Sequence, residues 1–238
     1  MRKHNRHFLR IIVLFGCVAL ITTCNAAQEK QTRSKEVTLR VRDYRPSRNV
    51  KKFDTELDSK HIFVDKALDL SKTALILIDV WDYHPNDGSL SRLKKNISEK
   101  VVPLVEWARN NGVQVVHAAH RSKISSLISV LPQDINLDEQ DSDHENLAVL
   151  LHNKGIETLL YAGYASNMCL INRGVGIYIM RRLHQFDILV VRDCTLAFEM
   201  PETLDKQWCN LVAINMIEAN WGASTTLDDL QKATAYAK

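Results

Sequence analysis

The chain has 238 residues, of which 45% are hydrophobic and 25% are charged. This length and composition suit one well-buried α/β domain with an N-terminal extension and argue against two full domains. The formal net charge of +3 comes from the N-terminus: without residues 1–26, which carry four basic and no acidic side chains, 27 basic residues face 28 acidic ones. The rest of the chain has no basic stripe with interleaved aromatic residues. Neither nucleic acid nor an anionic membrane surface is therefore an expected partner.

The N-terminal segment is typical of a secretory signal peptide. The basic stretch MRKHNRHFLR precedes the apolar run IIVLFGCVALI, which is too short for a membrane-spanning helix, and small residues follow in CNAA. We therefore predict a signal peptide over residues 1–27 and an exported protein, periplasmic or extracellular. Lipidation at Cys24 is the alternative, although the Ile-Thr-Thr before it departs from the usual lipoprotein pattern.

The order of elements predicts the fold class. Residues 28–70 are expected to form a polar tether and an N-terminal arm, with one short alternating strand at VTLRV. After residue 70, apolar strands are predicted at residues 74–80, 113–119, 134–137, 158–164 and 187–193, and helices at residues 91–111, 145–153, 168–180 and 201–220, before a short C-terminal strand and helix. Such alternation predicts a three-layer α/β/α domain over residues 71–238, with a mainly parallel, doubly wound, Rossmann-like sheet.

One cysteine lies where a fold can produce a thiolate. Cys169 follows the apolar run TLLYAGY and stands at the start of the helix predicted from Met168. Unpaired amides and the positive dipole end of a helix N-terminus favour the thiolate, so we predict a lowered thiol pKa and a nucleophilic cysteine. For an isolated thiol, a buried structural cysteine is the alternative.

Two segments resemble the isochorismatase-like cysteine hydrolases. The first is ALILIDVW, a strand that ends in Asp79, and the second is GYASNMC, which ends in Cys169, with RDCTLAFE following in the family's order. The resemblance extends from Lys72 to the C-terminus and implies a three-layer α/β/α domain. It implies Cys169 as the nucleophile with Asp79 beside it, and an oxyanion hole formed by the amides of Ala165 and Cys169. It also implies a cis peptide between Tyr164 and Ala165.

The third catalytic residue of that family, a lysine, is absent here. Its position aligns with Asn136, and no lysine lies between Lys123 and Lys154. Loss of this cation would raise the pKa of the Cys169 thiol and weaken the nucleophile at neutral pH.

Other basic side chains are candidates to replace the lysine. Arg173 follows Cys169 by four residues on the same helical face, Lys123 or Arg121 would reach in from the loop after the second strand, and His117 would act as a base. The structural alternatives are a surface salt bridge for Arg173 and a hydrogen-bonded, buried ring for His117.

The sequence gives no reason to expect a metal or another cofactor. The run Asp82-Tyr83-His84 resembles the Asp-x-His metal pair of nicotinamidases in the same superfamily, but it follows the wrong strand. We expect substrate-binding side chains at the mouth of the pocket instead, namely Trp81, His84, Tyr164 and Asn167.

Export would place three further cysteine positions in an oxidising compartment. Of Cys169, Cys194 and Cys209, at least one must stay unpaired within the chain, and Cys169 is the candidate to do so. Cys194 at a strand end and Cys209 within a predicted helix look more like two packed thiols than a disulfide, although their pairing stays open.

Three functions compete. The first is an isochorismatase-family hydrolase that acts on a small amide or other C–N bond through a Cys169 thioester, with Asp79 as base. The second is a catalytically impaired, hydrolase-like domain that binds a small ligand or a partner. The third is vinyl-ether hydrolysis of the isochorismate type, for which the sequence gives no specific support. The resemblance also implies a homo-oligomer.

Overall fold

The structure is a computed structural model that describes residues 35–45, 59–84, 87–119, 124–137 and 144–235. The predicted signal peptide over residues 1–27, including Cys24, lies outside these ranges, as do Arg121 and Lys123. Within them, no helix has the length and apolar character needed to cross a membrane.

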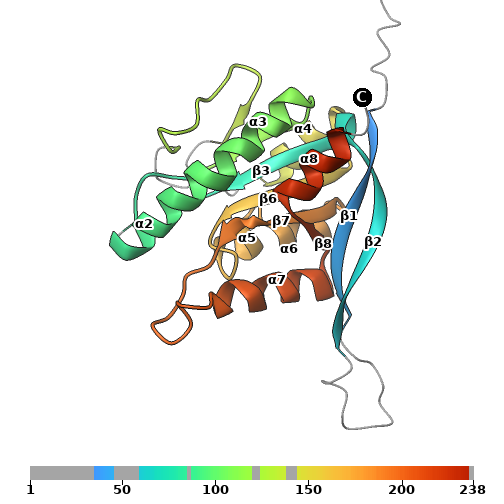
Figure 1. The fold of residues 1–238 in the computed structure, drawn as a ribbon. Helices are drawn as coiled ribbons and strands as arrows, with labels where there is room; N and C mark the ends of the chain where they lie inside the picture. The colour runs from blue at the N-terminus through green and yellow to red at the C-terminus, as the bar shows by residue number, and fades with distance from the viewer. Residues whose placement is uncertain (1–34, 46–58, 85–86, 120–123, 138–143, 236–238) are drawn as a thin grey trace, which may run out of the picture. The chain divides into compact units, whose positions relative to one another are not determined.

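An eight-stranded mixed sheet organises the described residues, in the order β2-β1-β8-β7-β6-β3-β4-β5 (Figure 1). The strands that run parallel to one another are β3 (Thr73–Ile78), β4 (Gln114–Ala118), β5 (Ile135–Asn136), β6 (Thr158–Tyr164), β7 (Asp187–Leu196) and β8 (Ala223–Thr225). All positions of β3 and β6 are buried, as expected of central strands covered on both faces. The predicted mainly parallel α/β fold is confirmed.

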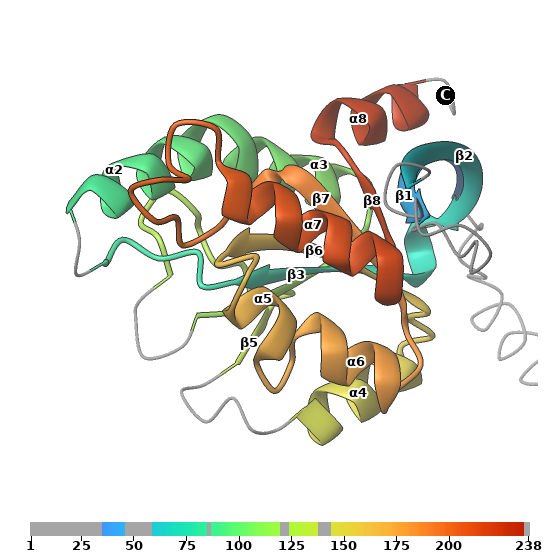
Figure 2. The same cartoon turned by 90° about the horizontal axis from the view of Figure 1, so that it is seen from below.

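Helices cover both faces of this sheet (Figure 2). One hydrophobic cluster packs beneath α2 (Asp87–Asn96), the π-helical turn η2 (Ile97–Val101), α3 (Val102–Asn110) and α8 (Leu227–Ala235). The second cluster lies under α4 (His144–Asn153), α5 (Cys169–Asn172), α6 (Ile177–Arg182) and α7 (Trp208–Asn220). The two clusters make the three layers that the sequence predicts.

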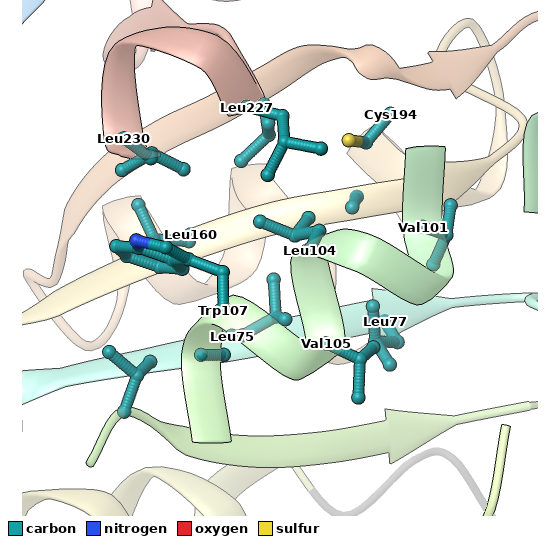
Figure 3. Close-up of a cluster of buried hydrophobic side chains, with 14 of the residues drawn as sticks. Leu75, Leu77, Val101, Leu104, Val105, Trp107, Leu160, Cys194, Leu227 and Leu230 are labelled. Carbon is teal, nitrogen blue, oxygen red and sulfur yellow. The ribbon is translucent and has the colours of Figure 1, made fainter. Parts of the chain in front are cut away.

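Figure 3 shows how the first cluster fills the space between α3, α8 and the sheet. Leu104 and Trp107 of α3 point toward Leu160 of β6, and Leu230 closes the cluster from α8. The indole Nε1 of Trp107 donates a hydrogen bond of 3.2 Å to Thr234 Oγ1, so its buried polar atom is satisfied.

The sheet extends into the region predicted to be a tether and an arm. β1 (Glu36–Arg45) pairs antiparallel with β2 (Lys60–Asp69) on one side and with β8 on the other. Val37, Leu39 and Val41 are buried in the first cluster, because the alternation in VTLRV turns every second residue inward. β2 is mostly exposed and lacks this alternation, which is why the sequence did not reveal it.

Three further boundaries differ from the sequence-based expectation. The helix expected at residues 168–180 is two short helices, α5 and α6, separated at Arg173, whose ψ of 160° leaves the helical region. Residues 201–207 form turns rather than the first part of α7, and η1 (Leu70–Lys72) is a short 3₁₀ helix before β3.

Candidate active site

The candidate site lies where β3 and β6 end side by side. The parallel register aligns Ile78 with Gly163, so Asp79 and the residues after Tyr164 emerge at the same edge of the sheet. Gly163 has a φ of +115°, and a Cβ atom there would lie 1.9 Å from the carbonyl oxygen of Ile78. Only glycine therefore permits this approach of the two backbones. Asp79 also adopts a positive φ, of 49°.

Asp79 and Arg173 form a buried ion pair at this edge. The guanidinium Nη1 of Arg173 donates to Asp79 Oδ1 and to the carbonyl oxygen of Ala118, the latter at 2.5 Å. The side chains are 1% and 7% exposed for Asp79 and Arg173, respectively. Burial lowers the pKa of Arg173, while the charge of Asp79 and the hydrogen bond to it oppose that shift. Arg173 is thus a buried partner of Asp79 and not a surface salt-bridge residue.

Cys169 lies against the same carboxylate. Burial, the negative charge of Asp79 and a hydrogen bond from the thiol to Asp79 together raise the pKa of Cys169 to about 12. This direction is opposite to the one that the helix N-terminus favours, and it agrees with the effect expected from loss of the lysine. Helix α5 has only four residues, and the desolvation of the sulfur with a carboxylate beside it outweighs the helix N-terminus.

Two backbone amides act on the sulfur in the opposite direction. Those of Ala165 and Cys169 donate hydrogen bonds to it, which favours the thiolate. They are the two amides that the resemblance implies for an oxyanion hole, and the peptide between Tyr164 and Ala165 is cis, as it also implies. Two donors at one sulfur are well placed for an oxygen that gains negative charge next to it.

His117 belongs to a different cluster. Its Nε2 lies 3.1 Å from Asp134 Oδ2, to which Arg109 of α3 also donates at 2.5 Å. The ring is 1% exposed, and burial lowers the pKa of His117. This is the structural alternative considered for His117, a buried and hydrogen-bonded ring. It lies on the α3 side of the sheet, whereas Arg173 reaches the site from α5 on the other side.

Asn136 occupies the position that aligns with the family's lysine. It pairs with His117 at the end of β5 and is exposed. The position carries a neutral amide, so among the described residues the cation that contacts Asp79 is supplied by Arg173.

Aromatic side chains gather around Tyr164. His84 Nε2 lies 3.3 Å from the hydroxyl of Tyr164, and the two rings meet edge to face with centroids 5.5 Å apart. Phe198 follows at 6.3 Å from His84. Burial raises the pKa of Tyr164, Arg92 lowers it and the charge of Cys169 raises it, so the hydroxyl lies within electrostatic reach of the thiol.

Asn167 and Trp81 have structural contacts that the sequence did not indicate. Asn167 Nδ2 donates to the Phe198 carbonyl at 3.0 Å, and its Oδ1 accepts from the Phe198 amide at 3.1 Å. The amide group therefore holds the loop after β7, and the expected contact of Asn167 with a substrate stays a prediction. Trp81 forms an isolated bridge with Ile124, and the two carboxylate oxygens of Asp82 accept hydrogen bonds from Ser125 and Ser126.

Solved structures with the same architecture identify the fold. A cysteine hydrolase from Pseudomonas syringae pv. phaseolicola 1448A superposes with a TM-score of 0.55 at 15% identity, over 72% of this chain and 96% of that one. An isochorismatase-like hydrolase from Alkaliphilus metalliredigens gives 0.53 at 17% identity over 69% and 97%, and an isochorismatase family protein from Desulfovibrio vulgaris gives 0.52 at 16% over 69% and 98%. The chain has the isochorismatase-like fold. No protein-family model and no curated protein matches its sequence.

One feature next to this site was not predicted from the sequence. The carboxylate of Glu199 accepts hydrogen bonds from the amides of Cys209 and Asn210 at 3.0 and 2.9 Å, and so caps the N-terminus of α7. Asn210 Oδ1 in turn accepts from Ser166 Oγ at 2.6 Å, next to the Ala165 amide. A cap from so distant a residue has no local sequence signature, because capping patterns are recognised at fixed short spacings.

Two further thiols lie in the part of the chain that the structure describes. Cys194 is buried with its sulfur 3.6 Å from the Lys100 carbonyl, Cys209 lies 3.4 Å from Thr203 Oγ1, and both are free. No group of three or more His, Cys, Asp or Glu side chains in these residues is arranged to hold a metal ion.

Proposed function

We propose that this protein is a cysteine hydrolase that cleaves a small amide or a related C–N bond through a thioester on Cys169. The observation that carries the proposal is the convergence of three groups on one sulfur. A buried carboxylate, Asp79, accepts the thiol proton, and the amides of Ala165 and Cys169 donate to the same atom. An acceptor for the proton together with two donors for developing negative charge is what acyl transfer to a thiol requires.

The first half of the reaction forms the acyl-enzyme. Asp79 takes the proton from Cys169 while the sulfur attacks the carbonyl carbon, so that a C–S bond forms and the carbonyl electrons move to oxygen. The amides of Ala165 and Cys169 stabilise that oxyanion. Collapse of the intermediate breaks the C–N bond, and the protonated Asp79 delivers its proton to the leaving nitrogen. Because the resting thiol has a raised pKa, proton transfer accompanies the attack rather than preceding it.

The second half releases the acid. Asp79 is again ionised and takes a proton from a water molecule that adds to the thioester carbon. The C–S bond then breaks and the sulfur regains its proton from Asp79. The balance is one amide plus one water giving one carboxylic acid and one amine, with Cys169 and Asp79 returned to their starting states.

Arg173 has a positioning role in this proposal. A carboxylate that is 1% exposed would take up a proton if its charge were uncompensated, and a protonated Asp79 is no base. The ion pair with Arg173 keeps Asp79 ionised and fixes its Oδ1, leaving the carboxylate available to the thiol. Arg173 therefore takes the place of the lysine whose position is occupied by Asn136.

One observation favours the alternative of a catalytically impaired binding domain. A thiol pKa of about 12 leaves a very small thiolate fraction at neutral pH, and a thiol that remains protonated is a weak nucleophile. The two functions differ in whether Asp79 removes the proton during attack on a bound substrate.

The test is trapping of the acyl-enzyme. The protein is incubated with a panel of small primary amides and N-carbamoyl compounds, and its intact mass is recorded with and without hydroxylamine, which cleaves thioesters. We expect a hydroxylamine-sensitive adduct on Cys169 together with amine or ammonia release. Both should be lost in Cys169→Ala and kept in Cys209→Ala, which removes a thiol that bonds Thr203. Turnover that survives Cys169→Ala would rule out the thioester.

A further inference from the structure

Arg92 is a partly buried cation for which the described residues provide no counter-ion. It lies on α2, and its Nη1 is buried without a hydrogen-bond partner among those residues. Guanidinium groups do not lose their charge in proteins, and burying such a group unpaired is costly. A site that keeps the charge there is suited to an anion that arrives from solution.

A cavity of about 400 Å³ lies beside this side chain. Its charged lining residues are four cations and two acids: Arg92, Lys95, Lys100, Arg192, Glu99 and Asp193. Lys100 already lies 3.3 Å from Asp193, and Arg192 donates to Ser224 at 3.1 Å. Among the described contacts, Arg92, Lys95 and Glu99 form no ion pair, so the cavity lining keeps a net positive charge.

Two residues that line the cavity contact neighbours of Ala165 in the Cys169 site. Leu196 lines it and pairs with Tyr164 across the sheet, and Asn210 lines it while accepting the hydrogen bond from Ser166. The two contacts flank Ala165, whose amide donates to the Cys169 sulfur. The Tyr164 hydroxyl lies within electrostatic reach of both the Arg92 guanidinium and the Cys169 thiol.

We propose that Arg92 binds a carboxylate of the substrate, so that the reaction at Cys169 is directed to small amides that also carry a carboxylate group. A guanidinium presents paired N–H donors that match the two oxygens of a carboxylate, and Lys95 adds positive charge in the same cavity. The substrate class rests on the proposed hydrolase function; the anion site at Arg92 does not depend on it.

Two alkylating reagents test the proposal without knowledge of the substrate. Iodoacetate and iodoacetamide both form a C–S bond with the Cys169 thiolate and release iodide. Iodoacetate carries a carboxylate where iodoacetamide carries a neutral amide. We expect the ratio of the iodoacetate rate to the iodoacetamide rate at Cys169 to be about tenfold higher than for free cysteine, since a charge-assisted hydrogen bond is worth about 1.5 kcal/mol or more. Arg92→Met should remove this preference.

Matched controls separate local from general electrostatics. Arg182→Met removes one positive charge from the exposed end of α6 and should leave the ratio unchanged. A ratio in Arg92→Met equal to that of the wild type would overturn the proposal. If neutral iodoacetamide also fails to label Cys169, the result contradicts the proposed nucleophile and does not test the anion site. The anion site is then tested by the binding of succinate. Succinate should raise the melting temperature of the wild type and of Arg182→Met but not that of Arg92→Met; equal shifts in all three would reject the site.

Discussion

The negative charge of Asp79 acts on two neighbouring groups, the Arg173 guanidinium and the Cys169 thiol. This charge stabilises the Arg173 guanidinium, and the same charge raises the pKa of the Cys169 thiol. The sulfur also receives two amide hydrogen bonds that favour ionisation, and these are outweighed in the resting state. Removing the Asp79 charge should therefore make the thiol more acidic and also remove the group that accepts its proton. The thiol pKa and the rate of hydrolysis report these two effects separately.

Asp79→Asn should make the thiol more acidic while abolishing hydrolysis. Burial is the largest cause of the raised Cys169 pKa and remains in the variant, but the substitution removes the charge and the carboxylate acceptor that raise it further, so the midpoint of iodoacetamide alkylation should move to lower pH. Labelling at neutral pH then becomes faster even though the base is gone. The rate is read by peptide mass against pH, with the exposed Asp187→Asn as control. A midpoint that stays in place or rises would show that Asp79 does not control the thiol.

Arg173→Met should destabilise the protein by about 3–5 kcal/mol, because it leaves the Asp79 carboxylate buried without its cation. Arg173→Lys keeps the charge but loses the hydrogen bonds of the planar group, so it should recover a large part of this stability. Urea unfolding measures the difference. If both variants unfold like the wild type, the ion pair does not hold Asp79 in place.

At the scale of elements, a break in a helix brings Arg173 to the site. The apolar residues after Met168 have helical spacing and predict one helix, but α5 ends after a single turn and α6 begins at Ile177. A Cβ atom on Gly176 would lie 2.8 Å from the carbonyl oxygen of Ile171, so the compact connection between the helices depends on glycine. In a continuous helix, Arg173 would follow a helical path instead of turning at ψ 160°.

Because β3 and β6 approach closely at Gly163, adding one methyl group there should cost much stability. Gly163→Ala places a Cβ 1.9 Å from the Ile78 carbonyl oxygen at a φ of +115°, so the strands must separate and we expect a loss of about 3 kcal/mol or more. Gly112→Ala is the matched control, with a φ of +76° and no atom within 4 Å of the new Cβ. It should cost about 1 kcal/mol, from backbone strain alone. Similar losses in urea unfolding would mean that the close approach is not the cause.

At the scale of the whole molecule, the β1–β2 hairpin is part of the domain. Buried residues of β1 belong to the same cluster as α3 and α8, and β1 pairs with β8. A variant without residues 1–34 should therefore unfold cooperatively and at the same melting temperature as the full chain. A variant without residues 1–70 should lose stability or fail to fold, because it exposes this side of the cluster. Equal melting temperatures would show that the hairpin does not contribute to the stability of the domain.

The sequence by itself determined the order of strands and helices after residue 70 and brought Asp79 and Cys169 to one edge of the sheet. Apolar periodicity is a local property, and the carboxyl ends of parallel strands meet at the same edge. Only the tertiary structure decided the state of the thiol and the partner of the carboxylate. The burial of the sulfur and the contacts of Asp79 with Cys169 and Arg173 join residues far apart in the chain, and no local pattern records them.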